Sequence, residues 1–136
     1  MITIKKIVYA VILLAVCFVN SAVLGETVKR VVPCPQDINE KEVMDKAIGE
    51  GQKMGYDLKQ EEAKVVLIQS YRPPEGSLSR WTVLRITLAI APGGDGRKAV
   101  IIDGERENAA AWDHTRNLNN DVTQIEKTVK KYLESK

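Results

Sequence analysis

The sequence is poor in the residues that most often build catalytic and metal centres. Its 136 residues include one histidine, two cysteines and one phenylalanine. A Ser-His-Asp triad or a histidine-rich metal site would have to be built around His114 alone, and no Gly-x-Ser-x-Gly motif accompanies it. We therefore expect a protein that is not an enzyme and holds no metal or cofactor, and we interpret His114 as a surface residue near a helix start.

Excess charge is also small. Lys5 and Lys6 alone account for the formal net charge of +2, because the rest of the chain has equal numbers of acidic and basic residues. Non-specific binding to nucleic acid or to an anionic membrane needs a basic field, so we expect no nucleic-acid partner. The composition, 44% hydrophobic and 28% charged, is that of a globular domain rather than a disordered chain.

The first 25 residues have the layout of a cleavable secretory signal. Lys5 and Lys6 precede an apolar run, Ile7 to Val19, which small and polar residues follow. This run is shorter than the roughly 20 residues that a membrane-spanning helix needs. We predict cleavage after Gly25 and no membrane span in the remainder.

Cleavage would divide the chain into a signal peptide, residues 1–25, and a single domain, residues 26–136. The domain would lie outside the cytoplasm, in a periplasm or in the extracellular medium. The domain would contain Cys34 but not Cys17, because Cys17 lies in the signal peptide. We interpret Cys34 as a buried or idle thiol. An intermolecular disulfide at Cys34 and lipidation of Cys17 remain open alternatives.

Hydrophobic periodicity predicts an α+β domain with the element order β-α-β-β-β-α. Asp37 or Asn39 is the predicted cap of the first helix, where Asn39 and Glu42 approximate a capping box, and Asn120 is the predicted cap of the last. The expected elements are an edge strand at 26–32, a helix at 40–54, a central strand within 56–71, strands at 80–91 and 97–105, and a helix after residue 120. The predicted fold is a two-layer sandwich, with an antiparallel sheet of about four strands and both helices on one face.

The strand at 80–91 has the clearest pattern. Its aliphatic side chains alternate with polar ones, and the buried set is predicted to be Leu84, Ile86, Leu88 and Ile90. Period-two alternation of this kind indicates one face packed on the core and one in solvent. The turn-forming stretch at 92–96 predicts a hairpin between this strand and the next.

Tryptophan and arginine supply much of the binding energy at protein interfaces. Trp81 and Arg85 share the predicted solvent face of this strand, and Tyr71 lies on the preceding strand. We therefore predict an interaction surface made by Tyr71, Trp81 and Arg85. The sequence favours an exported, non-enzymatic binding or envelope-assembly module, whose unknown partner is a protein of the envelope or the extracellular space. A small-ligand or lipid carrier, with a cleft between the sheet and the last helix, is the alternative, and homo-oligomerisation is left open.

Overall fold

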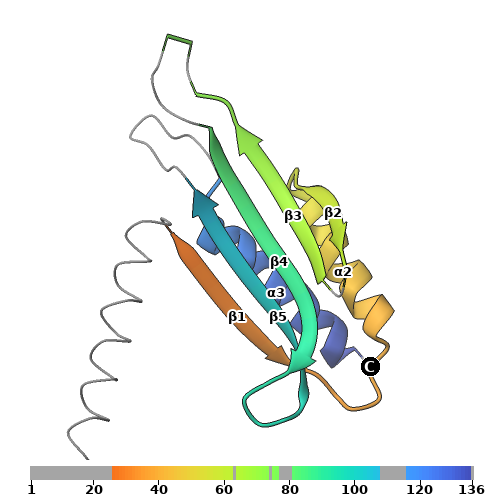
Figure 1. The fold of residues 1–136 in the computed structure, drawn as a ribbon. Helices are drawn as coiled ribbons and strands as arrows, with labels where there is room; N and C mark the ends of the chain where they lie inside the picture. Colours follow the sequence, from red (N-terminus) through yellow and green to blue (C-terminus); the bar gives the residue numbers. More distant parts are fainter. Residues whose placement is uncertain (1–25, 63, 74, 77–80, 108–115, 136) are drawn as a thin grey trace, which may run out of the picture.

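The computed structural model describes residues 26–62, 64–73, 75–76, 81–107 and 116–135. Its elements follow the predicted order, with one additional strand (Figure 1). They are β1 (Thr27–Pro33), α2 (Glu40–Lys53), β2 (Asp57–Glu61), β3 (Lys64–Tyr71), β4 (Thr82–Pro92), β5 (Lys98–Glu107) and α3 (Leu118–Glu134). The predicted α+β class is confirmed. The added strand is β2, a polar segment that pairs with β3.

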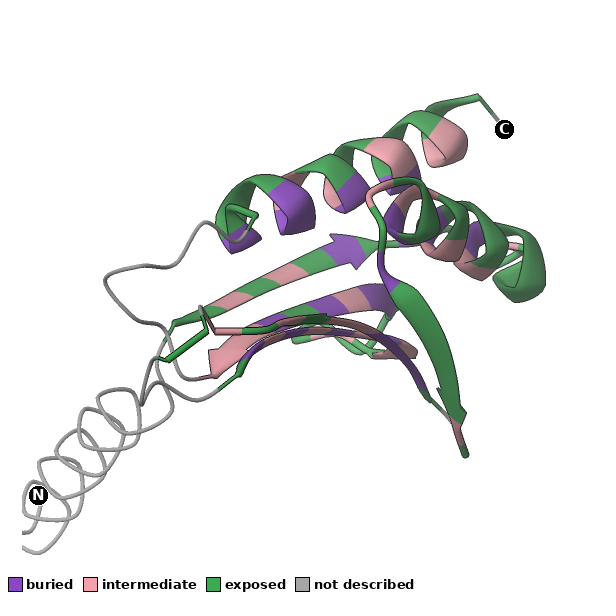
Figure 2. Ribbon diagram, turned by 90° about the horizontal axis from the view of Figure 1, so that it is seen from above, coloured by how far each residue is buried: buried purple, intermediate pink, exposed green. Residues whose placement is uncertain are grey.

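The sheet is antiparallel in every described pairing, and its strand order is β1-β5-β4-β3-β2. The predicted edge strand, β1, lies at one edge and β2 at the other. Seen from above, both helices lie on one side of the sheet (Figure 2). We call this the helix side and the opposite side the outer face.

Side-chain caps begin both helices. Of the two predicted caps, Asp37 and Asn39, it is Asn39 that caps α2, because its side-chain oxygen accepts a hydrogen bond from the Glu42 N–H at 3.1 Å. The prediction for α3 was wrong by three residues. Its cap is Asn117, and Asn120 donates its backbone N–H to the Asn117 side chain at 3.0 Å. The helix begins earlier because Leu118 is already one of its buried residues.

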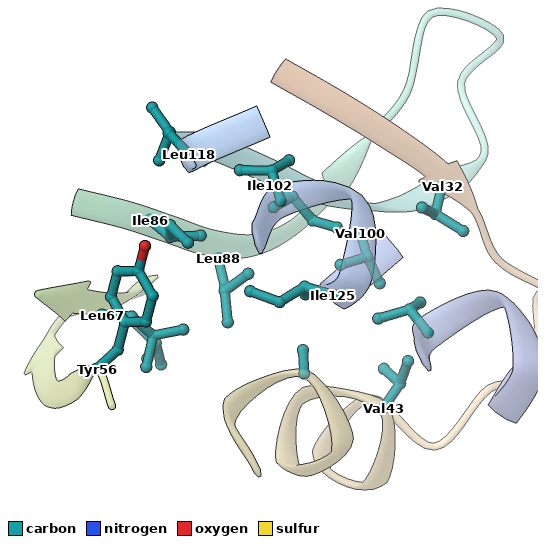
Figure 3. Packing of buried hydrophobic residues seen from close by; sticks show 14 of the residues in the cluster. Val32, Val43, Tyr56, Leu67, Ile86, Leu88, Val100, Ile102, Leu118 and Ile125 are labelled. Atoms are coloured by element: carbon teal, nitrogen blue, oxygen red, sulfur yellow. The ribbon is translucent and has the colours of Figure 1, made fainter. Parts of the chain in front are cut away.

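The core fills the space between the sheet and the helices. Leu84, Ile86 and Leu88 are fully buried, and Ile90 packs against the same cluster at partial burial, so the predicted register of this strand is confirmed. Figure 3 shows Leu88 of this strand directed toward Ile125 of α3. Arg85 and Thr87, on the other side of β4, are only partly buried.

Two glycines mark the closest contacts between the layers. A Cβ atom on Gly51 of α2 would lie 2.4 Å from Leu67 Cδ1 on β3. A Cβ on Gly104 of β5 would lie 2.7 Å from Val122 Cγ2 on α3. The absence of a side chain at these positions lets each helix approach the sheet closely.

The structure bears on two predictions: that Cys34 is a buried or idle thiol and that no membrane span follows the signal. Cys34 is 5% exposed, as predicted for a buried thiol, and burial raises its pKa. The signal segment, Cys17 and His114 lie outside the described residues. Within the described part of the chain, no helix has the length and apolar character needed to cross a membrane.

Candidate interaction surface

The outer face is the side of the sheet that neither α2 nor α3 covers. Because directly opposed residues of antiparallel strands share a face, the register identifies its members. Val83, Arg85, Thr87 and Ala89 alternate with the buried residues of β4 and therefore belong to it. Across the two neighbouring strands they are opposed by Ser70, Ile68 and Val66 of β3 and by Glu107, Glu105, Asp103 and Ile101 of β5.

Charged side chains on the outer face are matched across strands. Arg85 forms an ion pair with Glu107 and stands directly opposite Glu105. On the neighbouring pair of strands, Lys29 stands opposite Asp103. These five side chains carry three negative charges and two positive ones, so the centre of this face has a small negative excess. Arg85 is half-exposed but already neutralised by its partner Glu107.

Trp81 lies immediately before β4, at the end of the outer face where Val83 and Ile68 are only partly buried. It is 52% exposed, more than the other exposed large hydrophobic side chains, Val31 and Leu58. A large aromatic side chain next to half-buried aliphatic residues and a neutralised ion pair is typical of an interface centre. The structure thus brings Trp81 and Arg85 to the same end of the sheet.

Tyr71 is separated from the other two predicted residues, and its placement on their face was wrong. Tyr71 is opposed by Thr82, which is fully buried on the helix side with Leu84. Because paired residues share a face, the Tyr71 side chain lies on the helix side, where it packs against the core. The candidate surface therefore consists of Trp81, Arg85, Val83 and Ile68, without Tyr71.

Four surface hollows lie away from the outer face. They have volumes of about 370, 480, 310 and 330 Å³ and are lined by α2, α3 and the turn before α2, and none of the four includes a strand residue. Tyr132 borders three of them and donates its hydroxyl hydrogen to Glu42 of α2. That hydrogen bond raises the pKa of Tyr132 to about 12.

A buried polar cluster joins the start of β2 to the first turn of α3. The Tyr56 hydroxyl donates to Asp121 Oδ2 at 2.8 Å, and Arg116 donates to both Asp121 oxygens at 2.9 and 3.0 Å. Asp121 is 3% exposed and lies at the helix N-terminus, where a negative charge is favourable. Both carboxylate oxygens of Asp121 accept hydrogen bonds from Tyr56 or Arg116. The cluster therefore has a structural role, because it links α3 to the segment that leads into β2.

The environment of this cluster shifts two pKa values. Burial, followed by the hydrogen bond to Asp121, raises the pKa of Tyr56. The same carboxylate raises the pKa of Arg116. We had not predicted this cluster, because Tyr56 and Asp121 are 65 residues apart and no local motif links them. Among the described residues, no group of three or more His, Cys, Asp or Glu side chains could hold a metal ion.

Comparisons with known proteins identify no family. No family model and no curated protein matches the sequence. Among solved structures, the chain is similar to the crystal structure of the uncharacterized conserved protein YugN from Geobacillus kaustophilus HTA426. The TM-score is 0.39 and the sequence identity 14%, over 85% of this chain and 95% of that one. The function must therefore be argued from the site itself.

Proposed function

We propose that this protein is an exported, non-enzymatic protein-binding or envelope-assembly module that binds its partner with the outer face of the sheet. The observation that carries the proposal is the position of Trp81. It is 52% exposed, and it lies at the end of a sheet face that no described helix covers. Core burial does not account for a side chain of this size left half in solvent, whereas contact with a partner would.

The composition of the outer face supports a protein partner. Its partly buried aliphatic side chains provide apolar area at the Trp81 end of the face: Val83 lies two residues from Trp81 in sequence, and Ile68 stands opposite Arg85. The Arg85–Glu107 ion pair provides polar groups without net charge. An apolar centre bordered by matched charges resembles the anatomy of protein interfaces.

The packing between α3 and the sheet does not favour the carrier alternative. The α3 side chains that face the sheet are fully buried: Leu118, Val122, Ile125 and Val129. At Gly104 the two layers are so close that a single added carbon would overlap Val122. Side chains fill the space in which a lipid or small ligand would have to lie, so we retain the binding module as the function.

The proposed export can be tested by the N-terminus of the mature protein. If residues 1–25 are a cleaved signal, the protein isolated from cells should begin at Glu26, directly before β1. Intact-mass and N-terminal peptide mass spectrometry measure this directly. An intact Met1, or an acyl group on Cys17, would contradict the proposed processing.

The binding face can be tested by photo-crosslinking in cells, without changing Trp81. Ser70 is exposed on the outer face opposite Val83, and Lys127 is exposed on α3. A photo-reactive phenylalanine analogue at position 70 should give a discrete crosslinked product, because it would border the bound partner. The same analogue at position 127 is the matched control and should give none. Products from position 127 alone would assign the binding site to the helix side.

A further inference from the structure

The two edges of the sheet differ in how well they are protected against further strand pairing. Backbone hydrogen bonds from Cys34 N–H to Lys98 O and from Arg106 N–H to Glu26 O identify the β1 residues that bond inward. In the alternating antiparallel pattern, the backbone groups of four β1 residues therefore point toward the free edge: Thr27, Lys29, Val31 and Pro33. Proline has no N–H to offer there, and the Lys29 carbonyl already accepts a hydrogen bond from Arg30 at 3.0 Å. The β1 edge is thus protected at Lys29 and Pro33, whereas Thr27 and Val31 keep outward backbone groups.

The described β2 edge has neither a proline nor a side-chain hydrogen bond to its outward backbone groups. Two residues separate Glu61 from Lys64, so these two form the hydrogen-bonded pair that closes the β2–β3 hairpin. By alternation, Leu58 and Gln60 direct their N–H and C=O groups away from β3. No backbone hydrogen bond between these groups and a described residue outside the sheet pairings is present. Leu58 is also 44% exposed, so the edge offers both backbone groups and apolar surface.

The charges along β2 favour pairing of this edge with the β2 strand of a second copy of the chain. In an antiparallel pair of two β2 strands with a two-fold axis at Leu58, Asp57 of each copy stands opposite Lys59 of the other. The two Leu58 residues then form a hydrogen-bonded pair and cover each other's exposed side chain. A register with the axis at Lys59 would instead oppose the two lysines. One with the axis at Gln60 would keep an attractive pair, Lys59 opposite Glu61, but would oppose the exposed Leu58 to Glu62 and leave it without an apolar neighbour.

We propose that the free edge of β2 is a self-association surface, through which two copies of this chain join their sheets around Leu58. The contact is isologous, so it closes on itself as a dimer and does not propagate into a fibre. It goes beyond the proposed binding function, because it uses the edge of the sheet and leaves the outer face near Trp81 uncovered.

The mass of the protein in solution tests this proposal. The chain as isolated from cells should be a dimer by light scattering after size exclusion. Asp57→Lys and Lys59→Asp should each raise the dimer dissociation constant about tenfold or more, because each replaces two attractive cross-strand pairs with two repulsive ones. On β3, Asp57 and Lys59 are opposed by Ile68 and Val66, so neither substitution removes a charged partner there.

Mixing the two variants provides the decisive comparison. A strand with two lysines and a strand with two aspartates are complementary at both positions, so the mixture should recover dimers that contain one copy of each. Lys127→Glu, an exposed charge reversal on α3, should leave the dimer unchanged. Gln60→Pro, which removes an outward N–H, should give a folded monomer by circular dichroism. A monomeric wild type, or an Asp57→Lys variant that remains a dimer, overturns the proposal.

Discussion

Replacing Leu88 with alanine should lower the free energy of unfolding by about 2–5 kcal/mol, the range found when a large buried aliphatic side chain is truncated. Leu88 is fully buried at the centre of β4 and is opposed by Val65 on one side and Ile102 on the other. Its side chain points toward Ile125 of α3 (Figure 3). Truncation would leave a cavity where the sheet and α3 meet, and urea unfolding measures the loss.

Thr87→Ala is the matched control for this experiment. Thr87 is the neighbour of Leu88 on the same strand, but it belongs to the outer face and is partly exposed. Its truncation removes no core contact and should change stability by less than about 1 kcal/mol. If Thr87→Ala and Leu88→Ala cost the same, the assignment of the two faces of β4 is wrong.

The elements predicted well from sequence are those whose signals are local. The alternation along β4 identified its buried side chains, because a strand with one face on the core must repeat every second residue. The turn-forming residues between β4 and β5 predicted their hairpin, in which Gly93 N–H now bonds to Arg97 O at 2.6 Å. The Asn39 cap was equally local, since it depends on residues three apart.

The features that were missed depend on contacts between distant segments. β2 is polar and mostly exposed, so it has no hydrophobic alternation to reveal it, and only its pairing with β3 makes it a strand. Tyr71 was assigned to the wrong face because a shift of one residue in register exchanges the two faces. The Tyr56–Asp121 hydrogen bond joins opposite halves of the chain, which no local pattern encodes.

Replacing Trp81 with alanine should weaken partner binding about 30-fold or more, which corresponds to roughly 2 kcal/mol, the cost typical of an interface hot spot. Trp81 is 52% exposed and precedes β4, so its truncation removes much more contact area at the outer face than core packing. Val31→Ala is the matched control for position within the outer face, because Val31 is 45% exposed on the same face, opposite Ile101, but lies on the edge strand β1, toward the other end of the sheet from Trp81. It should leave binding nearly unchanged.

The most direct test of the outer face as a binding site is the dissociation constant of Trp81→Ala for the partner that position 70 crosslinks, measured together with thermal unfolding of the same variant. We predict that the dissociation constant rises about 30-fold or more while the melting temperature stays within a few degrees of the wild-type value. A variant that binds normally but unfolds at a markedly lower temperature would show that Trp81 serves packing, and would contradict the outer face as the binding site.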